Sequence, residues 1–571
     1  MNDRAPGAIT TIPLAEVRSK MKARNKPKGR QIDPQARADI AVLLNGHDIR
    51  RDLLIEYLHL IQDKFSCISA AHISALAETL KLAQTEVYEV ATFYHHFDVI
   101  RDGEDAPPAL TVRVCETLSC AMAGAAELLE KLPAILGSEV RVIAAPCIGR
   151  CDQAPAVCVG QNAFGDATVE NVAFAVKNQH VRAVQGNYVP FAAYKDEFGY
   201  QAYLDVLNGT RETEATLKEM EDSGLRGLGG AGFATGRKWR IVRAETGPRL
   251  MAINIDEGEP GTFKDRTYLE RDPHRFLEGM LIAAQVVGID KIYIYLRDEY
   301  HHCRALLETE LAALKANPPG GHALPQIELR RGAGAYICGE ESAMIESIEG
   351  KRGIPRLRPP YVAEVGLFDR PTLEHNFETL YWVRDILEKG AAWFAGHGRH
   401  GRKGLRSFSV SGRIKKPGVH LAPAGITVRE LIAEFCGGMS DGHEFYAYLP
   451  GGASGGILPA SMGDIPLDFD TLQPYGCFIG SAAITIMSQH DKARDAALNL
   501  MKFFEHESCG QCTPCRVGTE KAVQLLQESK WKIGLLEELS QVMVDASICG
   551  LGQAAPNPIR CVVKHFAHEI S

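Results

Sequence analysis

The chain has 571 residues, of which 45% are apolar and 23% charged, and its formal net charge is −8. This apolar fraction excludes a wholly disordered chain, and the negative charge gives no electrostatic basis for binding nucleic acid. No run approaches the ~20 apolar residues of a membrane span, and the N-terminus lacks an apolar signal core, so we expect a cytoplasmic chain without a membrane span. The fifteen cysteines are therefore expected to be thiols rather than disulfides.

The chain begins with a basic segment and a group of helices. Residues 1–32 crowd lysines and arginines together with almost no apolar face, which predicts either a solvated basic tail or an arm that docks on a partner. Residues 33–100 place Leu54, Leu58 and Ile61 at helical spacing and are predicted to be a helical N-terminal segment.

Residues 101–190 change to a small α/β pattern. Alternating apolar residues predict strands at 110–114, 140–143 and 156–159. A helix is predicted over 123–132, between the first two strands.

Three further segments complete the chain. Residues 191–404 alternate strand runs, at 250–255 and 291–296, with helical runs such as 277–287, which predicts α/β layering. Residues 405–490 read as β structure with one helix, which Thr427 and Glu430 would open as a capping box. Residues 491–571 are again helical in pattern.

The first cysteine set combines C-x4-C with C-x3-C after a 26-residue gap, at Cys115, Cys120, Cys147 and Cys151. Each pair begins where a predicted strand ends, so two loops at one sheet edge could bring four thiolates together. Four thiolates suit a [2Fe-2S] cluster or zinc, and the spacing favours the cluster because zinc usually takes tighter knuckles.

The second cysteine set is C-x2-C-x2-C with a distant fourth member, at Cys509, Cys512, Cys515 and Cys549. Three ligands from one tight loop and a fourth from a distance indicate a [4Fe-4S] cluster, with zinc as the rival. The other seven are predicted to be isolated packing thiols: Cys67, Cys158, Cys303, Cys338, Cys436, Cys477 and Cys561.

A glycine-rich loop, Gly227–Gly232, contains G-x-G-x-x-G. The preceding Thr216–Asp222 is helical in pattern and the segment near residue 250 is apolar, so the usual dinucleotide fingerprint is not met. Its backbone N–H groups could still bind phosphate or a flat ring, and Lys238 could add charge. Segments 254–264 and 334–341 crowd carboxylates beside glycine, which suits ribose hydroxyls as well as ordinary solvated turns.

Several long motifs now carry a family resemblance. The run VYEVATFY, followed by the first cysteine set, resembles the thioredoxin-like [2Fe-2S] subunit of complex I-type NADH dehydrogenases. Residues 224–571 resemble the flavin subunit of the same module through GLRGLGGAGFATGRKW, NIDEGEPGTFKDR, GAGAYICGEESAMIESIEGKRGIPRLRPP and ESCGQCTPCR. The resemblance covers nearly everything after about residue 35 and implies that the two subunits are fused.

The resemblance implies an α/β multidomain fold. After the N-terminal helices it implies a thioredoxin-like [2Fe-2S] domain over 101–190 and a Rossmann-like FMN and NAD domain over 191–404. A β-grasp-like domain of the soluble-ligand-binding type would follow over 405–490, and a helical [4Fe-4S] domain over 491–571.

The resemblance also implies the cofactor contacts. Those to FMN carry over to Gly227, Gly229, Gly230, Lys238, Asn254, Asp256, Tyr336, Gly339, Glu340 and Asn376. Those to NAD carry over to Phe233, Glu259, Glu341 and Arg358, with Glu259 and Glu341 near the nicotinamide. The two cysteine sets match the cluster ligands. No catalytic base is implied, because hydride transfer to FMN depends on proximity and orientation.

Some positions depart from the family pattern. Leu228 replaces the usual Arg of the glycine loop, and Ala234 replaces the usual Pro. Arg358 replaces a Lys and keeps the charge. His375 replaces the first Asn of an Asn-Asn pair and puts that flavin contact in doubt.

The partner is the least determined part of the prediction. The run FKDRTYLERDPHRFLEG (Phe263–Gly279) looks most like the β subunit of molybdenum- or tungsten-dependent, NAD-linked formate dehydrogenases. This resemblance predicts a diaphorase subunit that reduces NAD with electrons from a metal-pterin α subunit. The alternatives are a diaphorase subunit of an NAD-reducing hydrogenase or of complex I, a non-catalytic iron–sulfur relay scaffold, and a zinc-structured binding protein.

Overall fold

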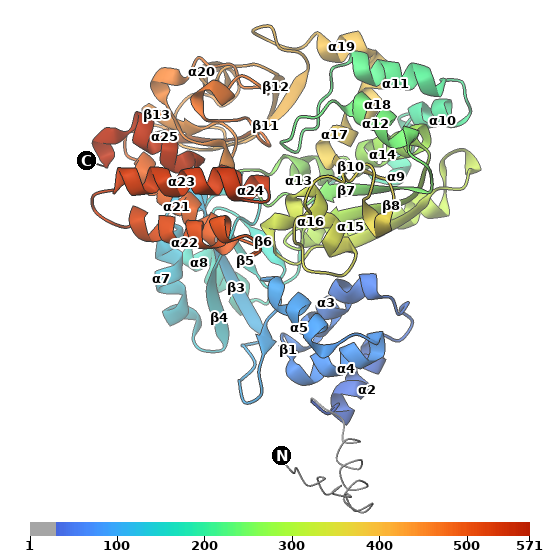
Figure 1. Cartoon of the computed structure of the whole chain (residues 1–571), viewed down its shortest axis with the longest axis horizontal. Helices are drawn as coiled ribbons and strands as arrows, with labels where there is room; N and C mark the ends of the chain where they lie inside the picture. Colours follow the sequence, from blue (N-terminus) through green and yellow to red (C-terminus); the bar gives the residue numbers. More distant parts are fainter. Residues whose placement is uncertain (1–29, 571) are drawn as a thin grey trace, which may run out of the picture.

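The computed structural model describes residues 30–570, so most of the predicted basic tail 1–32 lies outside the described residues. In Figure 1 the blue N-terminal helices lie below the domain of residues 191–404, which is drawn in green and yellow. The small sheet domain of residues 101–190 lies below the red C-terminal helices. Among the described helices, none combines the length and the apolar character that crossing a bilayer requires.

The N-terminal segment is helical, as its apolar spacing predicted. Leu54, Leu58 and Ile61 are all buried on one face of the second of these helices, and the Ser69 side chain caps the third by accepting from the His72 amide. The helices are α2 (Pro34–Leu43), α3 (Leu54–Phe65), α4 (Ala70–Leu80) and α5 (Gln84–Phe93). Two short strands, β1 (Ile68–Ser69) and β2 (Val99–Ile100), pair in parallel.

The next domain is a four-stranded sheet in the order β4-β3-β5-β6. Strands β3 (Leu110–Cys115) and β4 (Val140–Ala145) run parallel, while β5 (Val157–Val159) and β6 (Asn162–Phe164) are antiparallel additions. Helix α7 (Ala125–Leu136) packs against β4 and against α8 (Val169–Lys177). Three of these strands were predicted; β6 was missed because it directly follows the turn after β5 and begins with the polar Asn162.

The following domain holds four parallel strands in the order β10-β7-β8-β9. The apolar strands β7 (Arg249–Ile255) and β8 (Ile289–Leu296) were predicted, whereas the polar β9 (Gln326–Arg331) and β10 (Thr372–Asn376) were not. Its helices are α9 (Phe191–Asp196), α10 (Gln201–Leu207), α11 (Thr213–Asp222), α12 (Thr235–Ala244), α13 (Lys264–Leu269), α14 (Pro273–Val287), α15 (His301–Ala316), α16 (Glu341–Ile348), α17 (Phe377–Tyr381), α18 (Val383–Lys389) and α19 (Ala391–Ala395).

Residues 405–488 form a five-stranded mixed sheet with one helix. The strands are β11 (Leu405–Gly412), β12 (Gly418–Pro423), β13 (Phe445–Leu449), β14 (Leu458–Pro459) and β15 (Ala483–Ser488), in the order β12-β11-β15-β13-β14. Helix α20 (Val428–Glu434) opens with the predicted capping box of Thr427 and Glu430. The chain ends in α21 (Ala493–His506), α22 (Thr513–Leu526), α23 (Ile533–Ala546), α24 (Gly550–Ala554) and α25 (Asn557–His565).

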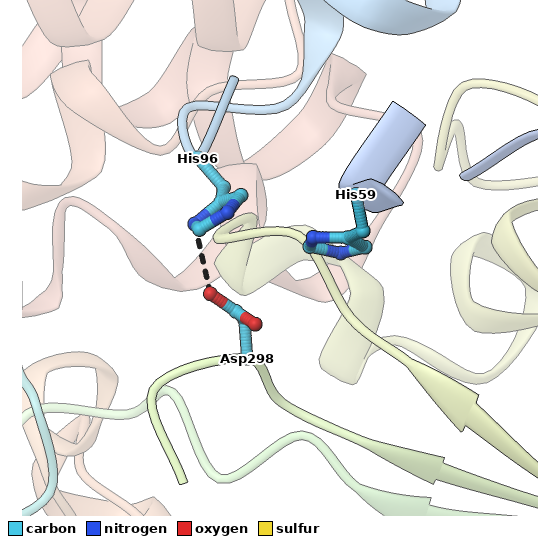
Figure 2. Close-up of side chains that lie close together, drawn as sticks. All are labelled: His59, His96 and Asp298. Carbon is cyan, nitrogen blue, oxygen red and sulfur yellow. Dashed lines mark ion pairs between the residues drawn. The ribbon is translucent and has the colours of Figure 1, made fainter. Parts of the chain in front are cut away.

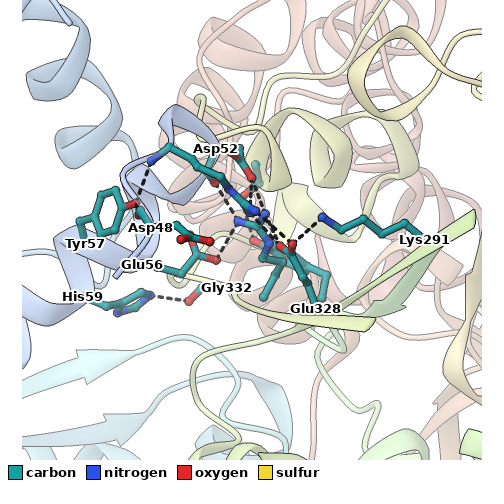
Figure 3. A network of polar contacts seen from close by, with 12 residues as sticks. Asp48, Asp52, Glu56, Tyr57, His59, Lys291, Glu328 and Gly332 are labelled. Carbon is teal, nitrogen blue, oxygen red and sulfur yellow. Dashed lines mark hydrogen bonds and ion pairs between the residues drawn. The ribbon is translucent and has the colours of Figure 1, made fainter. Parts of the chain in front are cut away.

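A polar network attaches the N-terminal helices to β9 (Figure 3). Glu328 accepts hydrogen bonds from Arg50, the closer at 2.9 Å, and pairs with Lys291 of β8. Arg330 donates to the Asp52 carbonyl oxygen at 2.8 Å. His59 on α3 donates through Nε2 to the carbonyl oxygen of Gly332 at 2.8 Å.

Candidate functional site

The structure brings the four thiols of the first cysteine set together at one sheet edge. Cys115 ends β3, Cys120 lies in α6 (Leu118–Met122), Cys147 follows β4, and Cys151 begins a short 3-10 helix. The Sγ atoms of Cys147 and Cys151 are 3.3 Å apart, and contacts with Cys120 and Cys147 raise the pKa of the Cys115 thiol. Each of the four is at most 3% exposed. A dry site with four converging thiols fits a [2Fe-2S] cluster.

The C-x3-C loop of this set rests on the neighbouring parallel-sheet domain. Arg297 donates through Nη2 to the Cys147 carbonyl oxygen at 2.6 Å, and Arg266 donates through Nε to the Gly149 carbonyl oxygen at 2.8 Å. Gly149 has φ +76°, and a Cβ there would lie 2.3 Å from the Tyr300 hydroxyl oxygen. Only glycine therefore allows this close approach of the two domains.

The second cysteine set gathers among the C-terminal helices. Cys509 and Cys512 precede α22, Cys515 lies in its first turn, and Cys549 directly precedes α24. A Cβ on Gly552 would lie 2.9 Å from the Cys515 Cβ, so glycine lets α24 approach α22. Cys515 is buried, whereas the other three are partly exposed. This arrangement fits a [4Fe-4S] cluster at the edge of the helical domain.

The glycine loop joins α11 to α12, so no strand precedes it and the usual dinucleotide fingerprint is absent, as predicted. The loop closes through a hydrogen bond from the Gly227 amide to the Phe233 carbonyl oxygen, at 2.8 Å. A Cβ on Gly229 would lie 3.0 Å from the Asn376 Cβ, and Gly230 has φ +130°. The loop therefore presents bare backbone toward the end of β10.

Amide and lysine side chains meet this loop at the carboxyl ends of the parallel strands. Asn254 of β7 lies in register with Asn376 of β10. The Asn254 Nδ2 donates to the Gly339 carbonyl oxygen at 2.9 Å, and the Asn376 Nδ2 donates to Asp265 at 2.7 Å. Lys238 donates to the Glu374 carbonyl oxygen at 3.0 Å. Ligands of parallel α/β sheets bind at this edge.

Two half-buried acids, Glu259 and Asp256, lie in the loop that follows β7. Burial raises the pKa of Glu259, which accepts from the Ser454 amide at 3.0 Å and from the Tyr336 hydroxyl. Burial also raises the pKa of Asp256 well above its ordinary value, and its Oδ2 has no partner among the described residues. A buried polar atom without a protein partner leaves a hydrogen-bond position for a bound group or a water molecule.

Three of the remaining predicted contacts, Glu340, Glu341 and Arg358, lie at the start of α16. Glu340 caps this helix by accepting from the amides of Ser342 and Ala343, both at 3.0 Å. Arg358 pairs with Glu341 at 2.8 Å and also contacts Glu340. The fourth, Phe233, is 42% exposed, and the Arg237 guanidinium lies 5.7 Å from the centre of its ring.

Two departures from the family pattern are explained by burial. His375 is 2% exposed and accepts through Nε2 from the Trp239 ring at 2.7 Å, so it packs in the core and leaves Asn376 as the amide at the glycine loop. Leu228 is 4% exposed, and its amide donates to Thr379 at 2.9 Å.

The residues present fit a flavin mononucleotide. A Cβ on Gly229 would fill space beside Asn376, and its absence leaves that space open. The backbone amides of the loop can donate hydrogen bonds to an anionic group. Two amide side chains, a lysine and the unpartnered Asp256 oxygen offer both donors and acceptors to a polar ring and a ribityl chain.

Sequence reasoning missed some residues and misjudged one pair. Arg297 and Ser454 lie in no motif, so only the folded chain shows that they contact the site: Arg297 donates to the Cys147 carbonyl oxygen and Ser454 donates to Glu259. Cys477 and Cys561 were predicted to be isolated, which is wrong: their Sγ atoms lie 3.5 Å apart. They are 84 residues apart in sequence, so spacing gave no signal.

Three other groups of metal-ligand type occur among the described residues: His59, His96 and Asp298; His95, His506 and Glu507; Glu270, His302 and Cys303. Figure 2 shows the first group, in which His96 Nδ1 faces Asp298 Oδ2 at 2.8 Å. Arg331 contacts the same carboxylate, and Arg304 lies 3.8 Å from it. Because two cations already occupy Asp298, we interpret this group as an ion-pair cluster between the N-terminal helices and the parallel-sheet domain.

Four family models match the chain in order. They are the thioredoxin-like [2Fe-2S] ferredoxin over residues 40–180, the Nuo51 FMN-binding domain over 220–385, the SLBB domain over 407–458 and the NADH-ubiquinone oxidoreductase-F iron-sulfur binding region over 495–571. Together with the site, they define an NAD-dependent flavin iron–sulfur oxidoreductase that uses FMN, a [2Fe-2S] cluster and a [4Fe-4S] cluster.

Individual proteins support the same class. An NADH-quinone oxidoreductase subunit of Rhizobium meliloti (strain 1021) is 39% identical over 66% of this chain and 93% of its own length. The mitochondrial NADH dehydrogenase [ubiquinone] flavoprotein 1 of Dictyostelium discoideum is 42% identical over 62% and 78%. A solved chain of an air-oxidized NAD+-reducing [NiFe]-hydrogenase has 30% identity and a TM-score of 0.78, covering 90% of this chain and 92% of its own. The chain belongs to the family of NADH-quinone oxidoreductase flavoproteins.

Proposed function

We propose that this chain is the diaphorase subunit of a larger NAD-linked enzyme and passes electrons between NAD(H) and an iron–sulfur partner subunit. The difference in burial between the two cysteine sets carries this proposal. The first set is buried throughout, whereas Cys509, Cys512 and Cys549 are partly exposed. Electron transfer between proteins weakens steeply with distance, so the [4Fe-4S] face is where a partner would dock.

The residues of the chain would bind and orient the reactants. FMN, when bound, exchanges hydride with NAD(H) and single electrons with the clusters. The glycine loop with Asn254 and Asn376 would hold the flavin. The nicotinamide dinucleotide would be oriented by the residues that the resemblance assigns to it: Phe233, Glu259, Glu341 and Arg358. Proximity and orientation are sufficient for hydride transfer, so no side chain is assigned as acid or base.

A hydrogenase or complex I partner has better support than a formate dehydrogenase partner. The similarity to the NAD+-reducing hydrogenase chain extends over 92% of that chain, which includes the fused arrangement. The formate hypothesis rests on the run Phe263–Gly279. Most of this run is buried in α13 and α14, and Arg266 within it holds the Gly149 carbonyl. The run therefore serves the internal domain contact and gives little information about the partner.

The diaphorase activity can be tested on the chain alone. Purified protein loaded with FMN and both clusters should reduce an artificial one-electron dye with NADH. If the loaded chain contains flavin and iron but cannot reduce the dye, the proposal is wrong and a non-catalytic relay scaffold becomes the better interpretation.

The partner can be identified from the native complex. The complex can be isolated through a tag on this chain. Assays of NAD+ reduction with hydrogen, NAD+ reduction with formate and quinone reduction with NADH then distinguish the hydrogenase, formate and complex I alternatives. A metal-pterin subunit in the isolated complex would favour formate despite the weaker support. A location in the cytoplasm remains a prediction from the sequence.

A further inference from the structure

Arg297 is a buried cation between the flavin domain and the loop of the first cysteine set. It directly follows β8 and is 4% exposed. Its Nη2 donates to the Cys147 carbonyl oxygen at 2.6 Å, and its Nη1 donates to the Glu257 carbonyl oxygen. One fixed positive charge therefore contacts the backbone of a predicted cluster ligand and the loop that carries Asp256 and Glu259.

Among the described side chains, Glu299 is the one carboxylate within 4 Å of Arg297, and the charge of Arg297 also acts on Asp256, where it opposes the burial that raises the pKa of that acid. The Arg297 Nε lies 3.1 Å from Glu299, whose side chain is 23% exposed and is thus partly screened by water. Its guanidinium also lies 5.0 Å from the centre of the Tyr300 ring. Glu299 is partly screened by water, so part of the positive charge of Arg297 remains to act on the dry space around the cysteines.

Arg266 provides a contrast in the same loop. It donates to the Gly149 carbonyl oxygen at 2.8 Å, but two carboxylates compensate its charge. Glu270 accepts two of its hydrogen bonds, at 2.8 and 3.0 Å, and Asp152 lies 3.1 Å away. Arg266 therefore serves mainly to hold the loop, whereas Arg297 holds it and also contributes an incompletely compensated charge.

We propose that Arg297 is a positioning residue that raises the reduction potential of the [2Fe-2S] cluster. Reduction adds a negative charge to a group that four thiolates already make anionic, and a cation beside it stabilises the reduced form. The four cysteines are at most 3% exposed, so little water screens the interaction. The inference rests on the proposed function only in assuming that these cysteines hold the cluster.

The test is a redox titration of the loaded protein, followed by the electron paramagnetic resonance signal of the reduced [2Fe-2S] cluster. In Arg297→Gln we expect about a tenfold smaller equilibrium constant for reduction, which corresponds to a midpoint lower by about 59 mV for one electron. Arg297→Lys keeps the charge and should stay close to the wild type. Glu299→Gln removes the opposing charge and should raise the midpoint.

The controls separate charge from loop geometry. The [4Fe-4S] midpoint in the same samples is the internal reference, and Arg266→Gln should shift the [2Fe-2S] midpoint less than Arg297→Gln does. The inference is overturned if the [2Fe-2S] midpoint is the same in the wild type and in Arg297→Gln. It is also overturned if Arg297→Gln and Arg297→Lys lower that midpoint by the same amount. If Arg297→Gln assembles no cluster, Glu299→Gln decides: a raised midpoint supports the inference, and an unchanged or lowered one overturns it. A wild-type protein without any [2Fe-2S] signal would instead refute the proposed function.

Discussion

Glu259 accepts hydrogen bonds from the Ser454 amide at 3.0 Å and from the Ser454 hydroxyl at 2.8 Å, across 195 residues of sequence. The contact joins the flavin domain to the loop between β13 and β14. Burial raises the pKa of Glu259, while these donors and the Tyr336 hydroxyl oppose the rise. The domain at 405–490, which carries no chemical motif of its own, thus stabilises a carboxylate predicted to lie beside the nicotinamide.

Replacing Ser454 with alanine should weaken NADH oxidation in a pH-dependent way. Loss of one donor raises the pKa of Glu259 further, and a hydrogen bond to a charged group contributes about 1.5–3 kcal/mol. The backbone amide of residue 454 still donates to Glu259 in this variant, so the loss is partial. We expect kcat/KM for NADH to fall about three- to tenfold near neutral pH, and to recover as pH rises because Glu259 then ionises. Ser454→Thr, which retains the hydroxyl, is the control; pH profiles that coincide for the wild type and Ser454→Ala would contradict the prediction.

Replacing Gly230 with valine should remove the flavin and leave the clusters. The residue has φ +130°, a conformation that a β-branched side chain does not adopt without strain. We expect flavin content to fall by about tenfold or more, by analogy with other positions that need glycine, with iron content unchanged. Absorbance spectra and iron analysis measure the two quantities. Gly534→Ala, at a helical position with open space around the new Cβ, should retain both cofactors.

Replacing Cys549 with serine should selectively damage the [4Fe-4S] cluster. A fully loaded chain is expected to contain about six iron atoms, of which about two should survive the substitution. The [2Fe-2S] signal should persist, because its four cysteines lie in another domain. Cys436→Ser is the matched control, since Cys436 is buried and belongs to neither cysteine set. Full iron content in Cys549→Ser would show that the fourth ligand has been misassigned.

Glu328 should hold the N-terminal helices on the flavin domain at neutral pH. Burial would raise its pKa, but hydrogen bonds from Arg50 and Lys291 and the charge of Arg330 lower it to about 2. A depressed acid pKa stabilises the folded state fully above about pH 5, and this stabilisation is lost as pH falls toward 2. Since Glu328 is partly exposed, we expect Glu328→Gln to cost ~1–2 kcal/mol of local stability at pH 7.

Hydrogen exchange of α3 measures this local stability. At pH 7 the amides of α3 should exchange faster in Glu328→Gln than in the wild type, and the difference should shrink as pH is lowered toward 4. Glu86→Gln removes a more exposed ion pair with Arg51 and should have a smaller effect. Unchanged α3 exchange in Glu328→Gln at pH 7 would exclude this role for the network.

Local sequence signals predicted much of the framework. The apolar alternation at 110–114 and 140–143 marked β3 and β4, and Thr427 with Glu430 marked the start of α20, because strand periodicity and capping act between residues close in sequence. The polar strands β9 and β10 were missed for the same reason. Their pairing with apolar neighbours, rather than their own composition, places them in the sheet.

The sequence by itself indicated the chemistry of this protein, since eight cysteines at characteristic spacings favour two iron–sulfur clusters and several long motifs carry the resemblance that implies FMN and NAD. Only the tertiary structure decided how these parts are coupled. It placed Arg297 against Cys147, Ser454 against Glu259 and His375 in the core, and it brought Cys477 to Cys561. Ligand type and spacing are local properties of a chain, whereas burial, charge compensation and contact between domains depend on segments that meet only when it folds.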